Sequence, residues 1–148
     1  MPAASEGLVR AYPPIILIID DNADHIAILS ALLSFHGHAL MTANTPENGL
    51  RFAGQHQPSA ILLDLHFDED PVGIRLIDQL RADPATSNIP LLVVSSFTDF
   101  HDDELRARGV PHVSKGGDIE SVLDFVRGVA DPERMLASTR DRNRQAAG

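Results

Sequence analysis

The sequence predicts an α/β fold in which a five-stranded parallel sheet carries helices on both faces. Short apolar runs rich in β-branched residues are typical of strands buried on both faces, and they alternate with segments whose apolar residues recur at helical spacing. This alternation favours parallel strands joined by right-handed crossover connections. The composition, 43% hydrophobic and 22% charged over 148 residues, is typical of a single globular domain.

The strands are predicted from the apolar runs. The first run, Ile15–Ile19, ends in the adjacent carboxylates of Asp20 and Asp21, and a later run, Ala60–Leu63, also stops at an aspartate, Asp64. We expect strands at 15–19, 38–43, 60–63, 90–96 and 110–114.

The helices are predicted from capping residues and from the spacing of apolar residues. Asn22 or Asp21 can cap the first helix, Gly37 can end it, and Thr45 followed by Pro46 can start the second. The later helices rest mainly on apolar residues that recur every three or four positions. We expect helices at 23–36, 46–55, 74–82 and 102–108, and a last one that starts at 117 or 118 and ends at about 130.

These elements suggest one domain over 14–130, with a flexible lead-in at 1–13 and a helical or disordered extension at 131–148. The formal net charge of −9 argues against nucleic-acid binding through a basic face. The absence of cysteine excludes disulfides and thiolate metal sites. No apolar run is long enough to span a bilayer and the N-terminus has no signal-peptide core, so we expect a cytoplasmic protein without a membrane partner.

Polar side chains follow four of the predicted strands. Asp20 and Asp21, Asp64, Ser95 and Lys115 each stand at or just after a strand end. Because the carboxyl ends of parallel strands lie at one edge of the sheet, where such folds bind ligands, we expect these side chains to meet there. Each has a plainer explanation when taken singly, such as a helix cap or a surface lysine. Their expected convergence is the specific signal.

The chemistry of such a cluster is that of phosphoryl transfer. Three neighbouring carboxylates repel one another unless a cation or a shared proton relieves them, and oxygen ligands suit Mg²⁺. One carboxylate can then attack a phosphoryl donor and form an acyl phosphate. Asp64 is the best nucleophile, because it is the lone carboxylate at its strand end and leaves the acid pair to hold the metal. Lys115 can reach one phosphoryl oxygen, and Ser95 can donate a hydrogen bond to another.

At these residues the chain resembles the receiver domains of two-component response regulators, of the CheY-like kind. The similarity spans about 14–130 and rests on Ile-Asp-Asp-Asn at 19–22, Leu-Leu-Asp-Leu at 62–65, Pro-Leu-Leu-Val-Val-Ser-Ser at 90–96 and the lysine that ends the fifth strand. The resemblance implies a doubly wound, flavodoxin-like fold with the strand order 2-1-3-4-5 and a function in phosphorelay signal transduction.

The resemblance also implies residue roles. A histidine kinase or a histidine phosphotransfer protein would transfer a phosphoryl group to Asp64, and Lys115 matches the family's invariant lysine. Asp21 would ligate Mg²⁺ directly, Asp20 mainly through water, and the backbone carbonyl of His66 would complete the protein ligands.

Two further positions match the family's switch residues, and two regions depart from its pattern. Ser95 matches the switch serine or threonine, and His112 stands where an aromatic switch side chain is usual. Gly116 replaces the proline that commonly follows the lysine, and the loop after Asp64 is longer and more acidic than usual. These departures keep open a receiver-like module that binds partners without being phosphorylated.

We therefore expect a stand-alone signalling module rather than an enzyme. Phosphorylation of Asp64 would draw Ser95 inward and change a surface that an unknown downstream protein reads, with a homodimer left open. An aspartyl-phosphate phosphohydrolase is the enzymatic alternative, since it uses the same residue types with Mg²⁺. Such an enzyme usually has a second aspartate two residues after its nucleophile, where this chain has His66.

Overall fold

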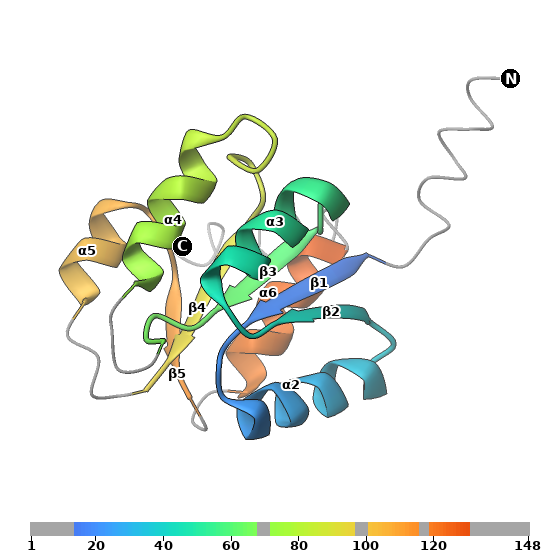
Figure 1. The fold of residues 1–148 in the computed structure, drawn as a ribbon. Helices are drawn as coiled ribbons and strands as arrows, with labels where there is room; N and C mark the ends of the chain where they lie inside the picture. The colour runs from blue at the N-terminus through green and yellow to red at the C-terminus, as the bar shows by residue number, and fades with distance from the viewer. Residues whose placement is uncertain (1–13, 68–71, 97–100, 116–118, 131–148) are drawn as a thin grey trace, which may run out of the picture.

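One parallel sheet of five strands organises the part of the chain that the structure describes. This computed structural model describes residues 14–67, 72–96, 101–115 and 119–130. The strands are β1 (Ile15–Ile19), β2 (Ala39–Ala43), β3 (Ala60–Leu63), β4 (Leu91–Ser95) and β5 (His112–Ser114). The helices are α2 (Ala23–Phe35), α3 (Pro46–His56), α4 (Gly73–Ala82), α5 (Asp102–Ala107) and α6 (Ile119–Ala130). The strand order β2-β1-β3-β4-β5, with every pair parallel, confirms the predicted doubly wound fold (Figure 1).

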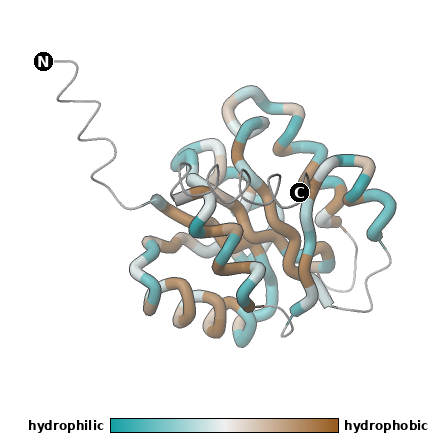
Figure 2. Tube along the Cα trace, turned by 180° about the vertical axis from the view of Figure 1, so that it is seen from behind, coloured by the Kyte–Doolittle hydropathy of each residue, from teal (hydrophilic) through white to brown (hydrophobic). Residues whose placement is uncertain are grey.

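Two apolar layers join the helices to the sheet. Leu17 and Ile19 of β1 pack in the layer with α3, α4 and α5, whereas Ile16 and Ile18 pack in the layer with α2 and α6. All four side chains are at most 1% exposed. Successive residues of a strand point to opposite faces, so a continuous apolar run serves both layers. Figure 2 shows the result as hydrophobic strands through the middle of the molecule.

Helix caps fix the chain direction just beyond the strand ends. Asn22 caps α2 by accepting a hydrogen bond from the backbone N–H of His25 at 3.0 Å, and Thr45 caps α3 by accepting one from Asn48 at 3.1 Å. Gly37 follows α2 with a left-handed φ of +85°. Of the two caps considered for α2, the structure uses Asn22.

The strand predicted at 90–96 covers only Leu91–Ser95. Two other predicted strand starts are wrong because helix ends use the backbone groups concerned. The N–H of Val110 donates to the carbonyl of Leu105 in α5, and the N–H of His38 donates to that of Leu33 in α2. Both residues therefore close a helix instead of pairing in the sheet, and β5 and β2 begin later than predicted.

Several predictions fall on residues outside the described part of the chain. They are the lead-in at 1–13, the extension at 131–148, the effect of Gly116 and the cap of the last helix. Within the described ranges, no helix combines the length and the apolar character that crossing a membrane requires.

Gly73 sets the start of α4 directly against the chain that follows Asp64. Its N–H donates to the carbonyl of Leu65 at 2.8 Å. A Cβ at this position would lie 2.4 Å from the Cα of Leu65 and 2.9 Å from the carbonyl oxygen of Asp64. Both are backbone atoms, so the strand end would have to shift for any larger residue to fit.

Replacing Gly73 by alanine should destabilise the protein by about 1–3 kcal/mol, because the added methyl group overpacks against backbone that cannot turn aside. Gly54 offers a matched control, since it lies in α3 with nothing within 4 Å of the place where its Cβ would stand. Gly54→Ala should be neutral or stabilising by up to about 1 kcal/mol. Urea unfolding followed by circular dichroism measures both variants. A Gly73→Ala protein as stable as the wild type would contradict the close approach.

Candidate functional site

Three carboxylates meet at the carboxyl edge of the sheet. Asp20 follows β1, Asp64 follows β3, and each of Asp20, Asp21 and Asp64 offers an oxygen that lies within 4.8 Å of the others. Asp20 and Asp64 are 1% and 5% exposed, whereas Asp21 faces solvent. The edge therefore holds two buried acids and one accessible acid at a single point.

Backbone hydrogen bonds hold the two buried aspartates at the same level. The N–H of Asp20 donates to the carbonyl of Ala43 at 3.0 Å, and the N–H of Asp64 donates to that of Ile19 at 2.9 Å. These bonds continue the parallel ladder one residue past the strands. Because β1 and β3 are neighbours in the sheet, the two carboxylates cannot separate without breaking the ladder.

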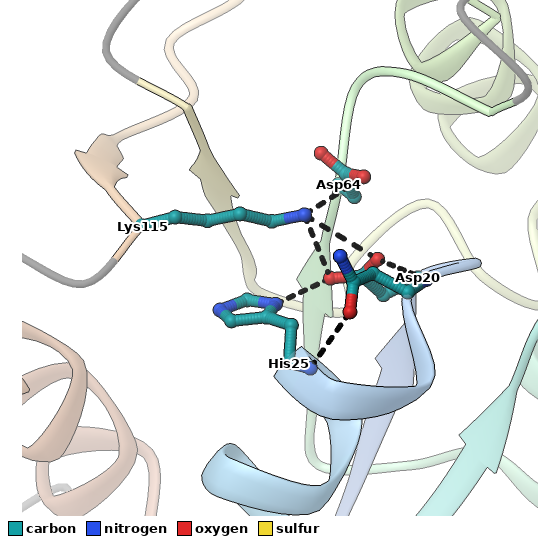
Figure 3. Close-up of polar contacts among 5 residues, drawn as sticks. Asp20, His25, Asp64 and Lys115 are labelled. Carbon is teal, nitrogen blue, oxygen red and sulfur yellow. Dashed lines mark hydrogen bonds and ion pairs between the residues drawn. The ribbon is translucent and has the colours of Figure 1, made fainter.

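Lys115 reaches both buried carboxylates from the end of β5. Its Nζ lies 3.2 Å from Asp64 Oδ2 and 3.3 Å from Asp20 Oδ2 (Figure 3). Its backbone N–H donates to the carbonyl of Ser95 at 2.6 Å, which fixes the start of the side chain against β4. The structure thus brings together four of the predicted residues, Asp20, Asp21, Asp64 and Lys115.

The remaining predicted residues lie around this group. Ser95 is buried at the end of β4, and it lines a hollow of about 150 Å³ together with Asp102 and His112. His112 is exposed on β5, where its Nε2 lies 2.9 Å from Asp102 Oδ1 of α5, away from the carboxylates. The backbone N–H of His66 donates to the Asp64 carboxylate, while its ring lies beside that of His101 with the centroids 5.7 Å apart.

Sequence reasoning missed His25, which contacts the buried carboxylate of Asp20. Its ring Nδ1 forms a hydrogen bond with Asp20 Oδ2, and the backbone N–H of Asn22 donates to Asp20 Oδ1 at 2.9 Å. The signal that could have found it is the spacing Asn22-x-x-His25 at the start of α2. In a capping box the third residue of the helix likewise turns its side chain back, to the backbone N–H of the cap, whereas the His25 ring reaches Asp20, two residues before the cap.

The two buried acids have opposite pKa shifts. Burial raises the pKa of Asp64, the negative charge of Asp20 raises it further, and the Lys115 ammonium opposes both only in part. Burial also works to raise the pKa of Asp20, but the hydrogen bonds from His25 and Asn22 and the charge of Lys115 outweigh it, so this pKa lies below its ordinary value. Asp20 is the firmly ionised member of the pair, and Asp64 carries the unrelieved repulsion.

The donor set fits a divalent cation. Three carboxylate oxygens converge, one acid remains accessible to solvent, and the unfavourable charge on Asp64 is what a cation would relieve. Hard oxygen ligands with room for retained water suit Mg²⁺ or Mn²⁺.

Comparison with known families identifies the class of protein that this fold and site define. Residues 16–127 match the response regulator receiver domain. The chain belongs to this family, which comprises signalling domains of two-component systems.

Individual relatives share this pattern over different lengths. Protein PilH of Pseudomonas aeruginosa is 30% identical over 117 residues, which make up 77% of this chain and 95% of PilH. The transcriptional regulatory protein KdpE of Mycobacterium tuberculosis is 33% identical over 88 residues, but these make up only 37% of KdpE. The chain therefore corresponds to nearly all of the first protein and to one part of the second.

Solved structures share the fold. That of a response regulator receiver protein from Pseudomonas putida has a TM-score of 0.69 at 25% identity, covering 78% of this chain and 97% of that one. The receiver domain of a sensor histidine kinase from Pseudomonas aeruginosa, with a magnesium ion coordinated in its active site cleft, has a TM-score of 0.70 at 16% identity. It covers 80% of this chain and 98% of its own, and at that identity the likeness concerns the fold.

In metal-free buffer at pH 7, Asp64→Asn should raise the melting temperature by several degrees. Its pKa is raised on folding, so the ionised carboxylate destabilises the folded state above that pKa, and the amide removes the charge while keeping an oxygen for Lys115. About 1 kcal/mol shifts the melting temperature of a domain this size by roughly 4 °C.

The difference in melting temperature between Asp64→Asn and the wild type should shrink as the pH falls through the raised pKa of Asp64 towards the ordinary value of 3.8. The reason is that Asp64 of the folded wild type then becomes protonated. Asp103→Asn, at an exposed acid of α5, serves as the control and should show no such gap. An Asp64→Asn protein that melts at or below the wild-type temperature at pH 7 would refute the unrelieved repulsion.

Proposed function

We propose that this receiver domain accepts a phosphoryl group on Asp64 from a histidine kinase or a histidine phosphotransfer protein, with Mg²⁺ bound beside it. The observation that carries the proposal is the contact between Lys115 Nζ and Asp64 Oδ2 at 3.2 Å, next to the Asp20–Asp21 pair. Asp64 supplies the nucleophilic carboxylate, and Lys115 supplies a cation for a phosphoryl oxygen. Asp20 and Asp21 supply two further acids for a metal.

The proposed metal ligands are Asp21, Asp64 and the backbone carbonyl of His66, with Asp20 acting mainly through water. Both oxygens of Asp20 already accept hydrogen bonds, which supports its indirect role, whereas Asp21 is exposed and accessible. The magnesium ion in the sensor kinase receiver domain and the Mn²⁺-bound form of response regulator Rcp1 support a divalent ion in this family. When bound, the ion supplies positive charge that offsets the charge on the acids and on the phosphoryl oxygens.

In the proposed transfer, a carboxylate oxygen of Asp64 attacks the phosphorus of a phosphohistidine. An O–P bond to Asp64 forms, the N–P bond to the donor breaks, and the donor imidazole keeps the electron pair of that bond and takes up a proton. The ammonium of Lys115 follows the negative charge from the carboxylate to a phosphoryl oxygen. The His66 N–H continues to donate to the carboxyl group of Asp64.

The proposed output is a change on the surface made by α5, β5 and α6. The new negative charge would draw the Ser95 hydroxyl towards the phosphoryl group, and His112 could then occupy the hollow that Ser95 lines. A downstream protein would bind this surface in only one of its two arrangements, phosphorylated or unphosphorylated. Hydrolysis of the acyl phosphate would restore the unphosphorylated arrangement.

Incubation with acetyl phosphate and Mg²⁺ should give a protein whose mass has increased by one phosphoryl group. Asp64→Asn should give no adduct, because the amide cannot act as the nucleophile. Intact-mass spectrometry measures both. Turnover of many equivalents of a phosphate ester would instead indicate a phosphohydrolase, and the lack of an adduct with every donor would indicate a module that binds partners unphosphorylated.

Lys115→Ala separates phosphorylation from switching in the same experiment. Some adduct should still form on Asp64, while the NMR shift changes at Ser95 and His112 that accompany phosphorylation should be reduced, because the cation that links the phosphoryl group to β5 is gone. Shift changes on phosphorylation as large as those of the wild type would contradict this part of the proposal.

Helix α2 offers a surface for the phosphoryl donor. It begins directly beyond the acid pair and exposes Ile28 at 60% and Phe35 at 85%, two large apolar side chains seven positions apart on one side of the helix. A protein that places a phosphohistidine against Asp64 must lie across this end of the sheet. Ile28, in the half of α2 nearer the acids, supports such a contact surface, whereas Phe35 ends the helix far from them.

Ile28→Ser should slow phosphotransfer from a phosphorylated histidine phosphotransfer protein about tenfold, the effect of losing one well-buried interface side chain. The rate with acetyl phosphate should not change, because this small donor needs no contact with α2. Ile119→Ser is the matched control, since Ile119 is 43% exposed but belongs to α6. Equal rates for Ile28→Ser and the wild type with the protein donor would place the docking surface elsewhere.

A further inference from the structure

His25 makes the most specific contact at the site that the proposed phosphoryl transfer does not use. Its side chain is only 12% exposed and its Nδ1 bonds to Asp20 Oδ2, so the imidazole is packed against the Asp20 carboxylate (Figure 3). A carboxylate can only accept hydrogen bonds, so the proton in this bond belongs to Nδ1. The backbone N–H of Asn22 occupies the other oxygen, Oδ1, at 2.9 Å.

These two donors fix the orientation of Asp20. With a hydrogen bond on each oxygen, the carboxylate cannot rotate without losing one of them. In this orientation it faces Lys115, whose Nζ lies 3.5 Å from Oδ1 and 3.3 Å from Oδ2. A cation at the acids therefore meets a carboxylate whose position is already set.

We propose that His25 is a positioning residue that fixes Asp20 through Nδ1 and thereby sets the affinity of the site for Mg²⁺. The inference deepens the proposed function, since it rests on the metal that this function requires. His25 touches neither the metal nor the phosphoryl group and acts through the orientation of Asp20. Its contribution resembles that of the hydrogen bonds that orient metal ligands in other proteins, whose loss commonly weakens metal binding 10–100-fold.

The inference has a plainer competitor, in which His25 only supports the start of α2. Its backbone N–H does bond to the Asn22 cap, but that bond uses the main chain and survives any substitution of the ring. The ring bond to Asp20 adds a separate interaction, and Asp20 lies before the helix, between β1 and the cap. The two roles therefore respond differently to side-chain changes.

Three substitutions at position 25 separate these roles. The amide nitrogen of asparagine stands as many bonds from the backbone as Nδ1, and that of glutamine as many as Nε2. His25→Asn thus keeps a donor at the Nδ1 position, His25→Gln moves it, and His25→Leu removes it. The dissociation constant of MgCl₂ is measured by isothermal titration calorimetry on the full chain, with a metal-free melting curve for each variant.

We expect His25→Asn to keep the Mg²⁺ affinity within about threefold of the wild type, and His25→Gln and His25→Leu to lose about tenfold or more. If His25→Leu does not fold, the comparison of His25→Asn with His25→Gln decides the question alone.

Equal Mg²⁺ affinity in all variants, or equal weakening in His25→Asn and His25→Gln, would overturn the positioning role while leaving the proposed function intact. A wild-type chain that binds no Mg²⁺ would instead contradict the proposed function itself, so the two failures are distinguishable.

Discussion

The repulsion between two buried aspartates at neighbouring strand ends is the constraint on which the rest of the site depends. Asp20 and Asp64 are nearly inaccessible to water, and the parallel pairing of β1 with β3 keeps them together. Ionised acids in this position are tolerable only with cations and hydrogen-bond donors around them. The structure distributes these unevenly: Asp20 has His25 and the Asn22 N–H, whereas Asp64 depends mainly on Lys115, which it shares. The opposite shifts of the two pKa values follow from this unequal support.

The fold creates the repulsion as a by-product of its own stability. Strands that are apolar on both faces leave the sheet edge as the place where charged side chains can lie, and the backbone ladder extends far enough to carry both aspartates. Gly73 then brings α4 against the residue after Asp64, so the chain at the site has little freedom to relieve the charge by moving. A rigid edge with unrelieved negative charge is suited to bind a cation, because the ligands need no rearrangement to receive it.

The sequence predicted what depends on topology and missed what depends on the orientation of single side chains. Continuous apolar runs that stop at Asp20 and Asp64 predict buried parallel strands, and parallel strands bring their ends to one edge, so the convergence followed from the pattern. The contact of His25 with Asp20 requires the geometry of the first turn of α2, for which the spacing from Asn22 is a weak signal. Likewise, the position of His112 in β5 was predictable but its pairing with Asp102 was not, because that pairing depends on how α5 packs beside β5.

Lys115 is where the electrostatics of the site connects to the rest of the sheet. Its ammonium lies within 3.3 Å of an oxygen of each buried acid. The proposed metal would neutralise the charge of these acids, and Asp64 would carry the proposed phosphoryl group. A divalent cation among the acids repels the ammonium, and a phosphoryl group on Asp64 attracts it, so each proposed state of the site has its own preferred position for Lys115. Its backbone N–H bonds to the carbonyl of Ser95, at the β4–β5 junction. A change at the acid pair would therefore act on β4 and β5 through one side chain whose backbone is hydrogen-bonded to the end of β4, which supports the surface beside α5 as the proposed output.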